Sequence, residues 1–184
     1  GYFNDRIADN IHDELWVKAI ALTDGETTLG LVTCDLIGVP APIIDAAKAM
    51  IEQRTGVAPE QVLISATHTH TAPSAKGGLG TPAMPEYAES LIPRIADAFV
   101  MALQNAVPAE AAYASGDAGE ETHNRRWHMR DGSVRMNPGY QNPDAIRAAG
   151  PTDPELGLLI IRDLDRQPIA VYANLALHYV GNSQ

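Results

Sequence analysis

The sequence predicts an α/β protein with mixed β-sheets that include a βαβ unit and hairpins and are flanked by helices. One observation is that apolar runs of strand length stand on both sides of a stretch with helical periodicity. Another is that further pairs of apolar runs are joined by short turn sequences. The chain has 184 residues, of which 45% are hydrophobic, and both values are normal for a globular domain with a real core.

The first half of the chain contains the predicted βαβ unit. Apolar runs at 15–22 and 28–36 flank the turn residues Asp24 and Gly25, which predicts a hairpin. Residues 43–54 have helical spacing, with Pro42 near the start and Gly56 just past the end. A third run follows at 62–67, so the strands at 28–36 and 62–67 should be parallel and joined by a right-handed crossover.

The second half is predicted in three parts. A helix should run from about residue 86 to 105, and Pro93 should either kink this helix or mark its true start. Residues 116–154 are polar and rich in Gly, Asn, Pro and Arg, which predicts a long irregular connection of the kind that is usually functional or mobile. A second hairpin is expected from strands at 157–163 and 168–177.

Composition excludes several classes of function. The formal charge is −10, from 13 basic and 23 acidic residues, and opposes binding to nucleic acid or to anionic membranes unless a local patch reverses it. The only dense basic cluster (Arg125, Arg126, Arg130, Arg135) fits a small anion or a substrate at most. No apolar stretch is long enough for a transmembrane segment, and residues 1–6 lack a signal-peptide pattern. The single cysteine, Cys34, excludes an internal disulfide and should be a buried small hydrophobe, so it leaves the compartment open. The sequence does not determine the oligomeric state.

The most informative motif is Thr67-His68-Thr69-His70 at the end of the 62–67 run. In an extended segment His68 and His70 would project to the same side. Ligands of parallel sheets bind beyond the carboxyl ends of the strands, and Asp35 stands at that end of the preceding strand. Imidazole is the commonest protein ligand of zinc, so this placement favours a functional histidine pair over two loop residues satisfied by the backbone. His178 directly follows the last apolar residue of the second hairpin and is a further candidate ligand.

Other hydrolase classes fit these residues less well. Metallo-β-lactamases continue His-x-His with x-Asp-His, whereas Thr71-Ala72-Pro73 follows here. Barrel amidohydrolases need about eight βα repeats, which this chain does not supply. Neither Ser65 nor Ser74 lies in a Gly-x-Ser-x-Gly nucleophile elbow.

Five segments together resemble the neutral (alkaline, non-lysosomal) ceramidases, which are zinc amidases. They are 11–15 (Ile-His-Asp-Glu-Leu), 32–36 (Val-Thr-Cys-Asp-Leu), 64–73 (Ile-Ser-Ala-Thr-His-Thr-His-Thr-Ala-Pro), Asn124-Arg125, and 176–178 (Ala-Leu-His). Their order and approximate spacing fit over essentially all 184 residues, and the Thr-His-Thr-His segment is the most specific. Thr71-Ala72 replaces the usual Ser-Gly of the family, and 126–137 departs from the family pattern.

The resemblance implies a site and a function. His68 and His178 would be zinc ligands, His70 and Arg125 would face the polar head of the substrate, and Asp35 would support the site from the neighbouring strand. The family's remaining ligands, a glutamate and a tyrosine, lie beyond residue 184, so residues 1–184 are expected to be the N-terminal portion of a larger catalytic domain. The implied reaction is cleavage of an N-acyl amide, such as ceramide or a ceramide-like lipid, by zinc-activated water.

Two alternatives stay open. Only two phenylalanines and two tryptophans are present, which leaves a smaller amide, an ester or a lactone as a substrate on the same scaffold. The other alternative is a non-catalytic binding relative that lacks the metal.

Overall fold

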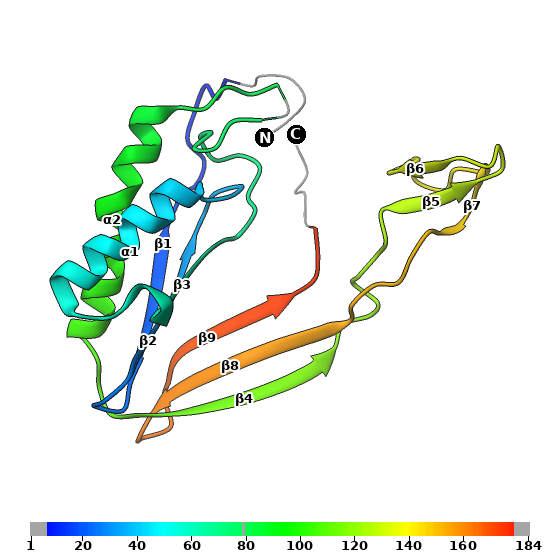
Figure 1. The fold of residues 1–184 in the computed structure, drawn as a ribbon. Coiled ribbons are helices and arrows are strands. Elements are labelled where there is room, and N and C mark those ends of the chain that lie inside the picture. The colour runs from blue at the N-terminus through cyan, green and yellow to red at the C-terminus, as the bar shows by residue number, and fades with distance from the viewer. Residues whose placement is uncertain (1–6, 79, 179–184) are drawn as a thin grey trace. The chain divides into compact units, whose positions relative to one another are not determined.

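The structure, a computed structural model, describes residues 7–78 and 80–178. The expectations for residues 1–6 and for the last six residues therefore lie outside its described part. The described residues divide into two compact units, one formed by those up to residue 107 and the other by residues 108–178. The first unit contains β1 (Val17–Thr23), β2 (Thr28–Cys34), α1 (Ala41–Thr55), the 3-10 turn η1 (Pro59–Gln61), β3 (Val62–Ala66) and α2 (Pro85–Gln104) (Figure 1).

The first unit confirms the predicted hairpin and βαβ unit. Its sheet has the order β1-β2-β3, with β1 antiparallel to β2 and β2 parallel to β3. The β1–β2 turn is stabilised by Asp24, whose Oδ1 accepts hydrogen bonds from the backbone N–H groups of Glu26 (3.0 Å) and Thr27 (2.8 Å). These hydrogen bonds, the one from Thr27 foremost, lower the pKa of Asp24. Gly25 takes the left-handed conformation that the turn requires.

Both helices form largely where the sequence predicts them. Pro42 lies in the first turn of α1, and Gly56 ends the helix in the left-handed conformation while its N–H donates to the Glu52 carbonyl. Helix α2 begins at Pro85 and continues through Pro93. The expectation that Pro93 might mark the true start of this helix is therefore wrong, because the apolar stripe on both sides of Pro93 packs into one core and holds the helix together.

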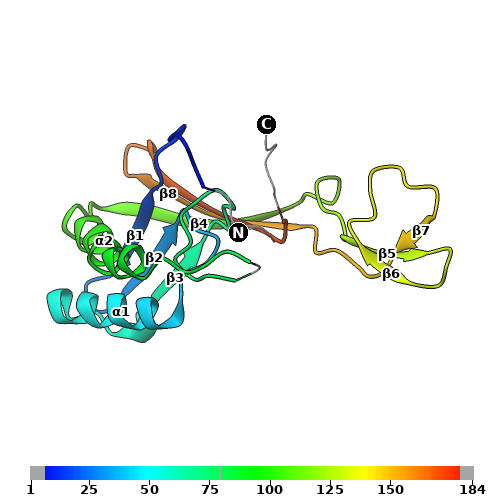
Figure 2. The same cartoon turned by 90° about the horizontal axis from the view of Figure 1, so that it is seen from above.

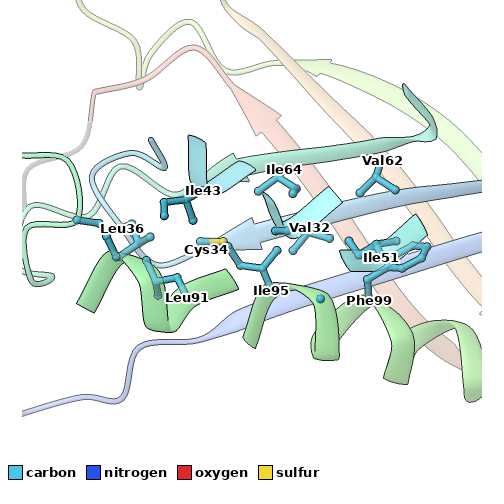
Figure 3. Close-up of a cluster of buried hydrophobic side chains, with 14 of the residues drawn as sticks. Val32, Cys34, Leu36, Ile43, Ile51, Val62, Ile64, Leu91, Ile95 and Phe99 are labelled. Atoms are coloured by element: carbon cyan, nitrogen blue, oxygen red, sulfur yellow. The ribbon is translucent and has the colours of Figure 1, made fainter. Parts of the chain in front are cut away.

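Both helices cover one face of the β1–β3 sheet, where they lie side by side (Figure 2). Alternate residues of β2 and β3 point to this face and are buried, as strand geometry requires. Figure 3 shows the resulting cluster, in which side chains of α1 and α2 meet those of β2 and β3. Its largest fully buried members are Phe99, Ile51, Ile95, Val32, Val62 and Cys34.

The second unit consists of strands. They are β4 (Ala109–Asp117), β5 (Arg126–Met129), β6 (Val134–Met136), β7 (Ala145–Ala148), β8 (Glu155–Asp163) and β9 (Pro168–Leu175). Strands β8 and β9 form the predicted hairpin and pair with β4 in a sheet of order β4-β8-β9. A second sheet has the order β6-β5-β7, and its strands are antiparallel.

The interpretation of residues 116–154 as a long irregular connection is wrong. Strands β5, β6 and β7 lie within this segment, and β4 extends to Asp117 at its start. The short strands escaped prediction because three or four residues with interspersed arginines show neither an apolar run nor a clear alternation. Within the described residues, none of the helices has the length and apolarity to cross a membrane.

Candidate metal centre

The two motif histidines lie just beyond the carboxyl end of β3. The Thr67 N–H donates to the Cys34 carbonyl (3.0 Å) and so extends the β2–β3 pairing by one residue. The backbone then turns sharply, because His68 has a φ of 64° in the left-handed region. The two imidazole rings are nevertheless close, with centroids 4.9 Å apart and an edge-to-face angle of 89°. The predicted proximity is confirmed, but a loop turn produces it rather than strand alternation.

The orientation of His68 is fixed by a backbone contact. Its Nδ1 lies 2.8 Å from the carbonyl oxygen of Ile37, in the loop that follows β2. Because a carbonyl oxygen only accepts hydrogen bonds, this contact requires the proton on Nδ1 and leaves Nε2 as the ring nitrogen that can bind a metal ion. Metal-binding histidines commonly have this arrangement, in which a hydrogen bond at one ring nitrogen sets the tautomer and aims the other at the ion.

Asp35 directly follows β2, and its carboxylate accepts hydrogen bonds from residues next to both neighbouring strands, β1 and β3. Its Oδ2 accepts a hydrogen bond from the backbone N–H of Trp16 (2.9 Å), just before β1. Its Oδ1 accepts one from the Thr67 hydroxyl (3.2 Å), just before His68. The carboxylate thus contacts the histidine segment through Thr67 and restrains the backbone from which His68 and His70 project.

Cys34 lies beside this site and is buried. Its side chain is 1% exposed and belongs to the core of the first unit, as the sequence predicts. Burial, with a smaller contribution from the charge of Asp35, raises the pKa of the thiol from 9.0 to about 11. Because the thiolate is the form that attacks substrates, this buried thiol is a poor nucleophile near neutral pH.

The other two predicted site residues belong to the second unit. Arg125 is exposed and directly precedes β5, where its carbonyl accepts a hydrogen bond from the Asn137 N–H (2.8 Å). Within the part of the chain that the structure describes, its guanidinium makes no hydrogen bond or ion pair. His178 follows the end of β9. Their roles toward the histidine pair remain predictions from the sequence.

Sequence analysis missed three residues that shape the site, namely Trp16, Ile37 and Thr67. Trp16 and Ile37 act through backbone atoms, which carry no signal in the residue type. Thr67 is the first residue of the Thr67-His68-Thr69-His70 motif. Its position directly before a candidate ligand is the signal that could have identified it as a partner of Asp35.

The fold is shared with two solved structures of ceramidases. One is a ceramidase complexed with C2, with a TM-score of 0.68 and 19% sequence identity over 94% of this chain and 27% of the other. The second is the neutral ceramidase from Pseudomonas aeruginosa, with a TM-score of 0.66 and 19% identity over 94% of this chain and 28% of the other. No family model and no curated protein matches the chain. At this identity the likeness establishes the fold, and the chain spans little more than a quarter of either ceramidase.

Proposed function

We propose that this chain is part of a zinc-dependent hydrolase that cleaves an N-acyl amide bond, in ceramide or a ceramide-like lipid. The observation that carries the proposal is the His68–His70 pair, held beyond the end of β3 with the His68 tautomer set by the Ile37 carbonyl. The likeness of the fold to two ceramidases supports an amide as the substrate. We also propose that residues 1–184 are the N-terminal portion of a larger catalytic domain; the coverage of about a quarter of each ceramidase supports a portion, and the N-terminal placement comes from the sequence resemblance.

The residues of the site have the chemistry that zinc requires. Imidazoles with one nitrogen anchored by a hydrogen bond are typical zinc ligands, and His68 has such an anchor at Nδ1. We assign metal binding to His68 and His178. Zinc bound there would supply a water with a pKa of about 7 and would polarise the carbonyl of the scissile bond.

The remaining residues act on the substrate or on the frame of the site. His70, whose ring meets that of His68, is assigned a hydrogen bond to the reacting oxygen or to the leaving group. Arg125, with an unengaged guanidinium among the described residues, is assigned to a substrate oxygen, where its charge stabilises the developing oxyanion. Asp35 holds the histidine segment through Thr67.

Zinc content tests the assignment of the histidines. The whole protein and its variants would be reconstituted with zinc and measured by elemental analysis. His68→Ala and His178→Ala should lose the metal, whereas His70→Ala should keep it and lose turnover. His123→Ala is the control, because His123 is an exposed loop residue of the second unit. A His70→Ala protein as depleted as His68→Ala would make His70 a ligand, and a wild-type protein without zinc would end the hydrolase proposal.

Kinetics test Arg125 and the substrate class. Removing a donor aimed at a developing oxyanion typically lowers turnover by about 100- to 1,000-fold. Arg125→Ala should show this loss on a short N-acyl amide, whereas Arg166→Ala, at an exposed residue of the β8–β9 turn, should not. Small and equal losses of turnover in Arg125→Ala and Arg166→Ala would show that Arg125 is a solvated loop residue without a role in catalysis. A preference for matched esters or lactones over amides would select the alternative substrate class.

A further inference from the structure

The small β6-β5-β7 sheet has one face of unusual composition. Residues paired across antiparallel strands lie on the same face, as do alternate residues of one strand. Arg126 pairs with Met136, and His128 pairs with both Val134 and Arg147. These five residues therefore share one face, which we call the cationic face. Val134 and Met136 are 51% and 54% exposed, and both arginines are exposed.

Within the described residues, neither arginine of the cationic face forms an ion pair with an acid. None of its five strand residues, all of them described, is acidic. The two carboxylates of the same segment, Asp131 and Asp144, instead line a pocket with Arg130 and Arg135. Arg135 lies on the opposite face, paired with Trp127 in the β5–β6 register, and forms an ion pair with Asp131 at 2.6 Å. The sequence cluster of four arginines is thus divided, and Arg147 joins Arg126 on the cationic face.

We propose that the cationic face docks on the surface of an anionic lipid bilayer. The arginines would contact lipid phosphates and carboxylates, while Val134 and Met136 would enter the boundary between headgroups and acyl chains. A positive face is complementary to such a surface even though the whole chain has a formal charge of −10. Nucleic acid explains the face less well, because two exposed aliphatic side chains between the cations gain nothing from a phosphate backbone.

This proposal does not depend on the zinc site or on turnover. Vesicle binding is measured on the metal-free or the metal-loaded protein alike, and a docked protein without hydrolase activity would leave the proposal intact. If both proposals hold, docking would bring the enzyme to the phase in which a lipid amide is found.

Sedimentation with vesicles tests the docking. The whole protein would be mixed with vesicles of phosphatidylcholine alone and with vesicles that also contain phosphatidylserine, at low and high salt. We expect binding to the anionic vesicles only, weakened by salt. Each cation near such a surface contributes about fivefold in affinity, so the double variant Arg126→Gln/Arg147→Gln should bind about 30-fold more weakly. The control Lys18→Gln/Arg166→Gln removes the same charge from β1 and from the β8–β9 turn and should bind like the wild type.

A second variant separates docking from simple charge attraction. Val134→Ser/Met136→Ser retains both arginines and should lose affinity on the order of tenfold, since it removes the apolar insertion. Unaltered thermal unfolding of each variant would show that the sheet remains folded. The proposal would be overturned if Lys18→Gln/Arg166→Gln lost as much affinity as Arg126→Gln/Arg147→Gln. It would also be overturned if the wild type bound neutral and anionic vesicles equally. Binding to polyuridylate that matches vesicle binding and is unaffected by the two serines would overturn it in favour of nucleic acid.

Discussion

The two units of this chain place their apolar side chains very differently. In the first unit, two helices and a sheet enclose a core in which Phe99, Ile51 and Ile95 are fully buried. In the second unit, Met129 and Ile161 are the buried apolar residues within the described range, and every residue of β4 is exposed. The first unit is therefore stabilised mainly by burial of apolar area, and the second mainly by the hydrogen bonds and side-chain pairs of its ladders.

This difference explains where a precise site can be built. His68 is held in a strained left-handed conformation, and such a conformation persists only where the surrounding structure fixes it. The residues that follow β2 and β3 provide that frame through Thr67 and the Ile37 carbonyl. Segments with few buried contacts open locally at low free energy, so the short strands of the second unit are better suited to contact a surface than to orient a metal ligand.

The largest effect is expected when the core of the first unit is broken. Phe99→Ala removes a fully buried ring of α2 and should lower the free energy of unfolding by about 3–5 kcal/mol. Val171→Ala, a truncation of a residue of β9 that is 58% exposed, should lower it by less than about 1 kcal/mol. Urea unfolding followed by circular dichroism compares the two. Similar losses would mean that the second unit depends on burial as much as the first.

A smaller effect is expected when the same core is overpacked. A Cβ atom added at Gly30 would lie 2.5 and 2.9 Å from ring carbons of Phe99 and 3.3 Å from Val62. Gly30→Ala should therefore lower the free energy of unfolding by about 1–3 kcal/mol. In β4 of the second unit, Gly116 has no atom within 4 Å of the corresponding Cβ position. Gly116→Ala should therefore change the free energy of unfolding by less than about 0.5 kcal/mol. A Gly30→Ala protein as stable as the Gly116→Ala protein would show that the ring moves aside freely.

The same contrast explains what could be predicted from the sequence. The β1–β2 hairpin, the βαβ unit and the β8–β9 hairpin were predictable because their residues form apolar runs bounded by turn or cap residues, such as Asp24 and Gly25 after β1 and Gly56 after α1. Strand β4 was not, since its alanines and polar residues are exposed and its position is set by pairing with β8. Likewise, the closeness of His68 and His70 was predictable from the motif. The turn at His68 and the Ile37 carbonyl that orients it were not, because backbone geometry is not encoded in a spacing.

The frame of the site can be loosened without opening the core. Asp35→Ala removes the hydrogen bonds to the Trp16 N–H and the Thr67 hydroxyl, and should lower the free energy of unfolding by about 1 kcal/mol. Partners that orient metal ligands typically change metal affinity by about 10- to 100-fold, so zinc retention by the whole protein should fall by a similar factor. Asp45→Ala, on the exposed side of α1, removes the same charge and serves as the control. Zinc retention that is equal in the two variants would show that Thr67 does not transmit the effect of Asp35.

The smallest effect concerns pH and is confined to the first unit. The folded protein raises the pKa of Cys34 from 9.0 to about 11, mainly through burial, so the native state holds this proton more tightly than the unfolded state. The resulting contribution to stability is complete below pH 9 and is lost as pH rises toward 11. Cys34→Ala should therefore show a weaker fall in the free energy of unfolding over this window than the wild type.

At pH 8 only about one thiol in a thousand is ionised in the native state, so a thiol reagent should react with Cys34 only after unfolding in urea. Rapid labelling of the native protein at pH 8 would show that the end of β2 beside the histidines opens to solvent. The first unit would then not hold the histidine segment more rigidly than the second unit holds its strands.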